Sequence, residues 1–363
     1  MKKNITQGME EKNDALKKVE RTLTPMPDTA LMQLADKIVA VIEKGKLQLA
    51  IDINRTIKST YWNVGRYIVE FEQQGNTKAK YGTNLLSSLA KILRARVGRG
   101  YSRPNLNNMR KFYVLFPDIS ENNESPICQM SDKLTWSHIC ELITIEDSLE
   151  REFYIKECIS QSWSVETLHR QKESGLFLRL ALSKDKQGIL ELAHKGQLIQ
   201  SAEDVVKDTY TLEFLGIEDK KRYKESELEQ KLADNMQKFL LELGKGFTFV
   251  GRQYALTINN THYHVDLVFY HRILRCFVLI DIKRGAVKHK DIGQMNMYMG
   301  YFAKDENVEG DNPPIGIVMS HYKDELMVEY ATYGMDSNLF VSKYELFLPN
   351  KEELRKLVMD ILK

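Results

Sequence analysis

The chain has 363 residues, and at roughly 150 residues per domain this length predicts two or three domains. Hydrophobic residues make up 43% and charged residues 28% of the sequence, which provides for ordinary cores and excludes wholesale disorder, collagen-like repeats and a disulfide scaffold. The 52 basic and 50 acidic side chains leave a formal charge of +2, which argues against a histone-like polycation.

The cysteines and the N-terminus indicate the compartment. Cys128, Cys140, Cys158 and Cys276 form no CxxC pair for zinc or thiol exchange, so buried free thiols in a reducing compartment are expected. Residues 1–30 are expected to form a flexible polar leader, which has no apolar signal segment, and nowhere do about 18 apolar residues run together. We therefore expect a soluble, cytoplasmic protein with no membrane partner.

Residues 31–174 are predicted to form a mainly helical domain, and one segment of it is strongly basic. From Gln73 to Pro117 there is no acidic residue. The other 318 residues carry 43 basic and 50 acidic side chains, so they have a net charge of −7. The basic side chains of the segment are Lys78, Lys80, Lys91, Arg94, Arg96, Arg99, Arg103, Arg110 and Lys111. Such a run in a folded region is typical of a surface that binds phosphate backbones.

Within this segment the pattern predicts a helix-turn-helix near residues 83–116. Apolar residues recur at helical spacing in the first helix, for which Thr83 is a candidate N-cap. Gly98 and Gly100 break that helix, and Ser102 can cap the second one. Such a unit can lay its second helix in the major groove of DNA, where Arg reads guanine and Asn reads adenine.

The outer face of the helix-turn-helix is basic. At 100° per residue, the apolar side chains of the second helix share one face, and Arg103, Asn107, Arg110 and Lys111 share the opposite one. The predicted DNA-binding residues of the whole unit are Lys91, Arg94, Arg96, Arg99, Arg103, Asn107, Arg110 and Lys111. The alternative is a solvated helical face that binds no ligand.

The second half of the chain has a different character. Residues 175–220 are predicted to be a linker with short helices, and residues 221–363 to be an α/β domain. In that domain one long helix precedes three runs with period two, which are followed by another helix and another strand. This order predicts a central mixed sheet.

Two aspartates and a lysine in this half carry the candidate chemistry. Asp266 lies in one predicted strand, while Asp281 and Lys283 share a face of the next, so a hairpin brings the two carboxylates together. Adjacent carboxylates repel each other and are stabilised by a hard divalent cation such as Mg²⁺. The lysine supplies the positive group with which phosphodiester hydrolysis orients a water and offsets developing charge.

These residues carry a family resemblance. The pattern D-x14-D-I-K, with a helix before it and a helix containing Gln294 and Tyr298 after it, resembles the PD-(D/E)xK nuclease superfamily. The segments DLVFYHRILRCFVLIDIK, GQMNMYMGYF, YWNVGRYIVEFEQ and YSRPNLNNMRKFY resemble the bacterial YhcG family. That likeness covers about residues 47–349 and implies a helical N-terminal domain joined to a restriction-endonuclease-like α/β domain.

The resemblance also implies roles for individual residues. It implies a Mg²⁺-dependent phosphodiesterase, for which Mn²⁺ is a substitute. Asp266 and Asp281 would bind the metal, the carbonyl of Ile282 would complete its shell, and Lys283 would position the nucleophilic water. Asp281 stands where many members have Glu, which shortens the reach of the side chain by one methylene.

Three further residues are assigned by the resemblance. The acidic residue of the leading helix, expected to serve the metal and catalysis, would be Glu229, with Glu225 and Glu227 as alternatives. Gln294 and Tyr298 match the Q-x-x-x-Y pattern and would support the site and the DNA strand, the alternative being ordinary helix-surface residues.

Two alternatives concern the site itself. His262 and His264 lie on the same strand face as Asp266, which suggests a transition-metal site as an alternative. The carboxylates argue against it, because they prefer metals that bind oxygen ligands. Asp281 and Lys283 could instead form a plain ion pair at a strand end.

We therefore expect a Mg²⁺-dependent DNA endonuclease that serves genome defence, repair or recombination. The alternative is a DNA-binding or assembly module that keeps the nuclease fold but cuts weakly or not at all alone, and RNA is a third candidate ligand. Cleavage of both strands by one active site per chain would favour a homodimer. The sequence identifies no defence or repair partner.

Overall fold

The computed structural model describes residues 29–73, 84–117, 132–217, 223–322, 324–333 and 338–363. The chain divides into two compact units, residues 1–60 and 61–363. The described residues of the first unit form the beginning of α2 (Thr29–Phe71), which continues into the second unit. Among all described residues, no helix combines the length and the apolar character needed to cross a membrane.

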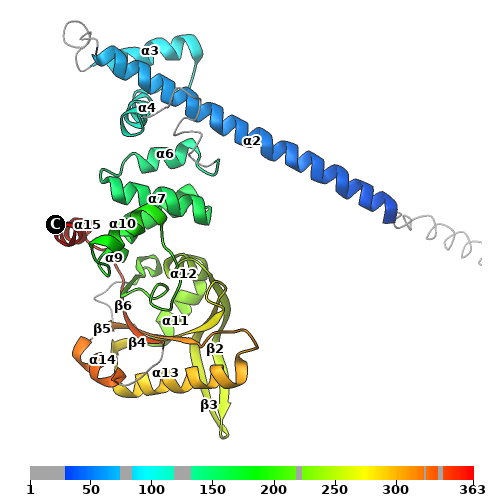
Figure 1. Cartoon of the computed structure of the whole chain (residues 1–363), viewed down its shortest axis with the longest axis vertical. Helices are drawn as coiled ribbons and strands as arrows, with labels where there is room; N and C mark the ends of the chain where they lie inside the picture. Colours follow the sequence, from blue (N-terminus) through cyan, green and yellow to red (C-terminus); the bar gives the residue numbers. More distant parts are fainter. Residues whose placement is uncertain (1–28, 74–83, 118–131, 218–222, 323, 334–337) are drawn as a thin grey trace, which may run out of the picture. The chain divides into compact units, whose positions relative to one another are not determined.

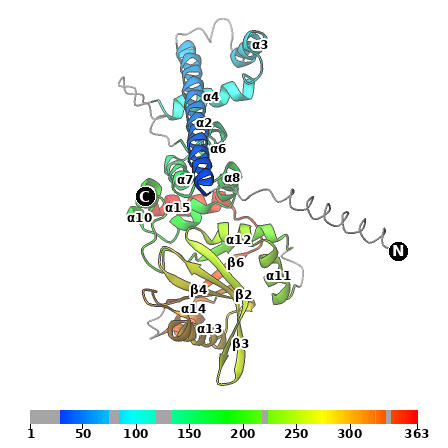
Figure 2. The same cartoon turned by 90° about the vertical axis from the view of Figure 1, so that its right-hand side faces the viewer.

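The second unit begins with a helical region. Its helices are α3 (Leu85–Val97), α4 (Arg103–Leu115), α6 (Trp136–Leu142), α7 (Ser148–Gln161), α8 (Val165–Glu173), α9 (Leu176–Ala181) and α10 (Lys186–Lys195) (Figures 1 and 2). Between α3 and α4, Gly98 and Gly100 have φ angles of 89° and 112°, a left-handed conformation that favours glycine. The Ser102 side chain accepts the Asn105 N–H and caps α4, whereas the predicted cap Thr83 lies outside the described residues.

A six-stranded mixed sheet follows, in the order β1-β6-β5-β4-β3-β2. The strands are β1 (Thr209–Thr211), β2 (Phe247–Ile258), β3 (Thr261–His271), β4 (Cys276–Ala286), β5 (Ile315–Tyr322) and β6 (Leu339–Glu345). β2, β3 and β4 pair antiparallel, and β4, β5, β6 and β1 pair parallel. The predicted fold class, a helical region followed by an α/β domain with a central mixed sheet, is confirmed.

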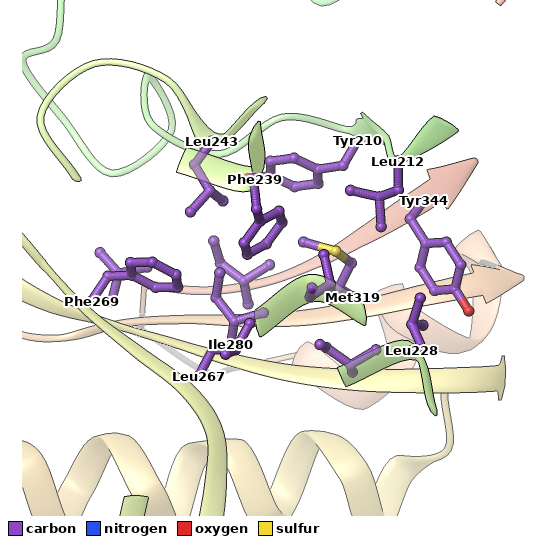
Figure 3. Close-up of a cluster of buried hydrophobic side chains, with 14 of the residues drawn as sticks. Tyr210, Leu212, Leu228, Phe239, Leu243, Leu267, Phe269, Ile280, Met319 and Tyr344 are labelled. Atoms are coloured by element: carbon purple, nitrogen blue, oxygen red, sulfur yellow. The ribbon is translucent and has the colours of Figure 1, made fainter. Parts of the chain in front are cut away.

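Helices cover both faces of the sheet (Figures 1 and 2). On one face lie α11 (Glu225–Asp234) and α12 (Met236–Leu243), whose side chains form a core with Leu267, Phe269 and Ile280 (Figure 3). On the other lie α13 (His289–Tyr301), which continues into the short η4 (Phe302–Glu306), and α14 (Glu325–Thr332). Alternation along β4 therefore points Ile280 and Asp281 to opposite faces.

The prediction of one long helix after residue 220 is wrong, because the structure has two helices there. α11 and α12 meet at Asn235, whose φ of −114° and ψ of 29° are not helical. The side-chain amide of Asn235 donates to the carbonyl of Lys231 at 3.0 Å. Asparagine competes for backbone groups in this way, which explains the break.

Two segments pack outside the domain to which the sequence assigns them. β1 and the short helix η3 (Glu213–Leu215) lie in the predicted linker, yet β1 is an edge strand of the sheet and pairs with β6. α15 (Lys351–Leu362) ends the predicted nuclease segment but buries Val358 in the helical core, against α9 and α10. Lys351 Nζ also lies 3.1 Å from a carboxylate oxygen of Glu173 in α8.

A buried carboxylate joins the helical region to the sheet domain. Glu242 of α12 is fully buried, and its Oε1 lies 2.7 Å from Arg179 Nη1 of α9 and accepts the Thr211 N–H of β1 at 2.9 Å. Lys207 Nζ and Arg170 Nη1 lie 3.6 and 3.5 Å from the carboxylate. Burial would raise the pKa of Glu242, but these cations outweigh it and hold the pKa at about 2.

Candidate active site

Asp266 of β3 and Asp281 of β4 lie side by side where the two strands stop pairing. The last paired residues are Leu267 and Ile280, so the aspartates follow directly beyond them. The Ile282 N–H donates to Asp266 Oδ2 at 2.7 Å, which fixes that carboxylate against β4. Lys283, two residues along the same face, places Nζ 2.6 Å from Asp281 Oδ2.

The pKa values of both aspartates are raised. Burial raises the pKa of Asp281 to about 7, and the negative charge of Asp266 adds to the rise. Burial and the charge of Glu229 raise the pKa of Asp266, against the opposing effect of the Ile282 N–H. Burial alone would lower the pKa of Lys283, but the aspartates overcome this and raise it. The site therefore concentrates negative charge, and among the described residues the one ion pair with the aspartates is that of Lys283.

The donor set suits a hard divalent cation. Asp281 is 3% exposed, and its Oδ2 has no aligned hydrogen-bond donor despite the nearby Lys283 ammonium, so this contact is an ion pair of poor hydrogen-bond geometry. In the described part of the chain no three His, Cys, Asp or Glu side chains converge closely enough to enclose an ion. Mg²⁺ fits such an open set, because it usually takes one or two carboxylates and keeps several waters.

Glu229 is the leading-helix acid that reaches the aspartates, and a glutamine connects them. Gln253 Nε2 donates to Glu229 Oε2 at 2.7 Å and to Asp266 Oδ1 at 3.0 Å. Of the alternatives, Glu225 Oε1 accepts the Arg284 N–H at 3.0 Å, and Glu227 is exposed. The metal-binding and catalytic roles of Glu229 stay predictions.

Gln253 was not found from the sequence. Its φ of 46° is left-handed, which is uncommon for a residue other than glycine, and β2 shifts register nearby, between Phe249 and Gly251. A glycine inside a strand pattern signals such a bulge, so Gly251 was the available clue.

Gln294 and Tyr298 contact each other on α13. The Gln294 side-chain amide donates to the Tyr298 hydroxyl. Tyr298 is fully buried in the core beneath the site, and burial raises the pKa of its hydroxyl, with a smaller contribution from the charges of Asp281 and Asp266. Tyr298 is therefore a core residue whose hydroxyl responds to the site, and its support of the DNA strand stays a prediction.

The histidine alternative gains no support among the described residues. His262 and His264 are both exposed toward the tip of the β2–β3 hairpin, and His262 Nδ1 lies 2.9 Å from the hydroxyl of Thr257 on the neighbouring strand. No metal-binding group of side chains includes either of them there.

The basic side chains of α3, of α4 and of the turn between them are mostly exposed. Those that face solvent are Lys91, Arg94, Arg96, Arg99, Arg103 and Lys111. A pocket of about 360 Å³ between the two helices is lined by four of them, together with the glycine turn. Asn107 is half-buried, and Arg110 Nε lies 2.7 Å from Glu72 Oε2, an acid that precedes the acid-free stretch by one residue. Lys78 and Lys80 lie outside the described residues.

Known proteins resemble both halves of the chain. A family model described as the DUF1016 N-terminal domain matches residues 37–179, and one described as the YhcG PDDEXK nuclease domain matches residues 203–359. A protein of Escherichia coli (strain K12) named "Putative nuclease YhcG" is 33% identical over 346 residues, which are 89% of this chain and 92% of that protein.

Two solved structures match part of the chain. A repair endonuclease from Pyrococcus abyssi is 20% identical, with a TM-score of 0.25 over 36% of this chain. A complex of EndoMS with double-stranded DNA is 16% identical, with a TM-score of 0.25 over 37% of this chain. In both cases the match spans 50% of the solved chain.

Proposed function

The chain belongs to the YhcG family, in which a DUF1016 N-terminal domain precedes a PDDEXK nuclease domain, and from this membership we propose that it is a metal-dependent endonuclease that hydrolyses phosphodiester bonds in DNA. The observation that carries the proposal is the cluster of Asp266, Asp281 and Lys283 at the point where β3 and β4 stop pairing. Asp281 is buried there, and Asp266 and Lys283 are half-buried. Genome defence, repair or recombination would use such an activity.

Each side chain of this group has a task in hydrolysis. Asp266 and Asp281, with the Ile282 carbonyl, would hold Mg²⁺ or Mn²⁺, and the bound cation would polarise the phosphate and lower the pKa of a water. The Ile282 N–H and Gln253 keep the Asp266 carboxylate in place. Lys283 presents a positive charge 2.6 Å from Asp281, where it orients the attacking water and offsets the charge that develops on the phosphate.

The exposed basic surface of α3 and α4 supports DNA as the substrate. Its lysines and arginines can neutralise backbone phosphates, and none of those lining the pocket between these helices has an ion-pair partner within the described residues. The exposed Arg103 stands in the first turn of α4, the end of a recognition helix that contacts bases.

The test is cleavage of supercoiled and linear DNA with Mg²⁺ or Mn²⁺. We expect wild-type protein to nick or cut the DNA, and Asp281→Asn and Lys283→Ala to lose this activity while folding normally by circular dichroism. Equal cleavage by all three proteins would contradict the assignment of the site. DNA binding by wild-type protein without cleavage of DNA or RNA under either metal would instead favour the assembly-module alternative.

A further inference from the structure

A cavity opens on one side of the candidate active site. Its volume is about 570 Å³, within the range of roughly 300–1,000 Å³ that is typical of ligand pockets. Its walls include Glu229 and Gln230 of α11, Arg252 and Gln253 of β2, and Asp266 of β3. A molecule bound there would therefore contact the acidic residues of the site directly.

The irregular backbone of β2 builds one wall of this cavity. In a regular strand, successive side chains point to opposite faces of the sheet. Arg252 and Gln253 are successive and nevertheless line the same cavity. The register shift next to Gly251 and the left-handed φ of Gln253 account for this exception. Bulges beside active sites commonly redirect a side chain in this manner, and the strain persists where surrounding structure enforces it.

Arg252 is held in place without losing its charge. Its Nη1 donates to Gln230 Oε1 at 2.9 Å, and Gln230 Nε2 in turn donates to Asp234 Oδ1 at 2.7 Å. The neutral amide of Gln230 thus orients the guanidinium and lies between it and the Asp234 carboxylate in this chain of hydrogen bonds. Arg252 forms no ion pair within the described ranges of the chain, and it is exposed to solvent. It is therefore a cation that Gln230 orients and that has no ion-pair partner among those residues.

The groove continues beyond Arg252. Gln230 and Arg252 also line an adjoining pocket of about 380 Å³, whose walls include Met236 and Phe249. Phe249 is 39% exposed, so part of its ring is open to solvent in this pocket. The outer pocket thus places the basic side chain of Arg252 near the apolar side chains of Met236 and Phe249, and Asp234 also lines it. A basic and an apolar wall suit the phosphate and the base of a nucleic-acid strand.

We propose that these two pockets bind the DNA strand next to the bond that is cut, and that Arg252 holds the phosphate that flanks the scissile one. The proposal rests on the proposed endonuclease function and names the residue that places the strand. A guanidinium suits this task because its planar N–H groups match phosphate oxygens in pairs. The carboxylates nearby would otherwise repel a polyanion.

Binding measurements without divalent metal test the proposal independently of cleavage. The proteins are wild type, Arg252→Gln, and Arg272→Gln as a matched control, because Arg272 is exposed in the β3–β4 turn and lines neither pocket. We expect Arg252→Gln to bind a DNA oligonucleotide about tenfold more weakly at low salt, since a charge-assisted hydrogen bond contributes about 1.5 kcal/mol or more. The slope of log K against log salt should fall by about 0.9, the loss of one phosphate contact.

Equal affinity and equal salt slope for Arg252→Gln and Arg272→Gln would overturn the proposal. A second measurement locates the phosphate, by placing a neutral methylphosphonate at each position around the cut of an oligonucleotide. The substitution next to the cut should slow cleavage by wild type and have no effect on Arg252→Gln. Wild-type protein that binds DNA but never cuts would refute the endonuclease function, and the binding comparison would still decide the role of Arg252.

Discussion

Replacing Glu242 by glutamine should destabilise the protein strongly, because its buried carboxylate lies among three cations. Glutamine keeps the shape and can still accept the Thr211 N–H, which Glu242 accepts at 2.9 Å. It removes the charge that offsets Arg179 and Lys207, which are almost completely buried. Arg170 keeps a second acid, because its Nε lies 3.4 Å from Glu213 Oε1. Breaking a buried ion pair from one side typically costs about 3–5 kcal/mol.

The pKa of Glu242 gives a second measure of the same interaction. Folding lowers it from 4.5 to about 2, and at about 1.4 kcal/mol per pKa unit this corresponds to about 3 kcal/mol of stability. Because the folded pKa is the lower one, the contribution is complete above pH 4.5 and is lost as the pH falls toward 2. The two approaches therefore agree on about 3 kcal/mol at neutral pH.

Denaturant unfolding at pH 7 and at pH 3 measures this effect. We expect Glu242→Gln to lose about 3 kcal/mol at pH 7 and a smaller amount at pH 3, where the wild type has already lost part of the contribution. Lys207→Met is the control, and it should cost less than half as much, because Glu242 keeps both arginines. A loss below about 1 kcal/mol for Glu242→Gln at pH 7 would show that the junction is not a closely coupled buried cluster.

Three further outcomes concern the active site and the basic surface. Lys283→Ala should slow Mg²⁺-dependent cleavage about 100- to 1,000-fold with little change in DNA affinity, as measured by single-turnover assays. Gln253→Ala should weaken Mg²⁺ binding about 10- to 100-fold by titration calorimetry, because it frees the Asp266 and Glu229 carboxylates. Replacing Arg94, Arg99 and Arg103 together by Gln should lower the salt slope of DNA binding by about 3. An unchanged value in any of these measurements would contradict the role stated.

The parts of the site that depend on strand periodicity could be predicted from the sequence. Period two places Asp281 and Lys283 on one face of β4, and the short turn after His271 brings Asp266 beside them. Gln253 could not be predicted, because its reach to Asp266 depends on a left-handed backbone that glutamine rarely adopts. Local patterns do not encode that kind of strain.

In the fold, too, the features that depend on neighbouring residues could be predicted, and those that depend on residues far apart in the sequence could not. The Ser102 cap and the glycine turn follow from neighbouring residues and were predicted. The pairing of β1 with β6, and the burial of Val358 of α15 among helices from the first half, join residues more than a hundred positions apart. Three residues of β1 have too little pattern of their own to be recognised as a strand.

The packing of α15 against the helical region has a consequence for anyone who dissects this protein. The sheet domain is an insertion within the helical core, tethered to it at both its first and its last residue. An expression fragment that starts at residue 203, where the nuclease family model begins, would carry α15 without the helices that cover Val358. A tag or truncation at the C-terminus would likewise act on the helical core, and only a fragment that retains both ends of the core keeps it whole.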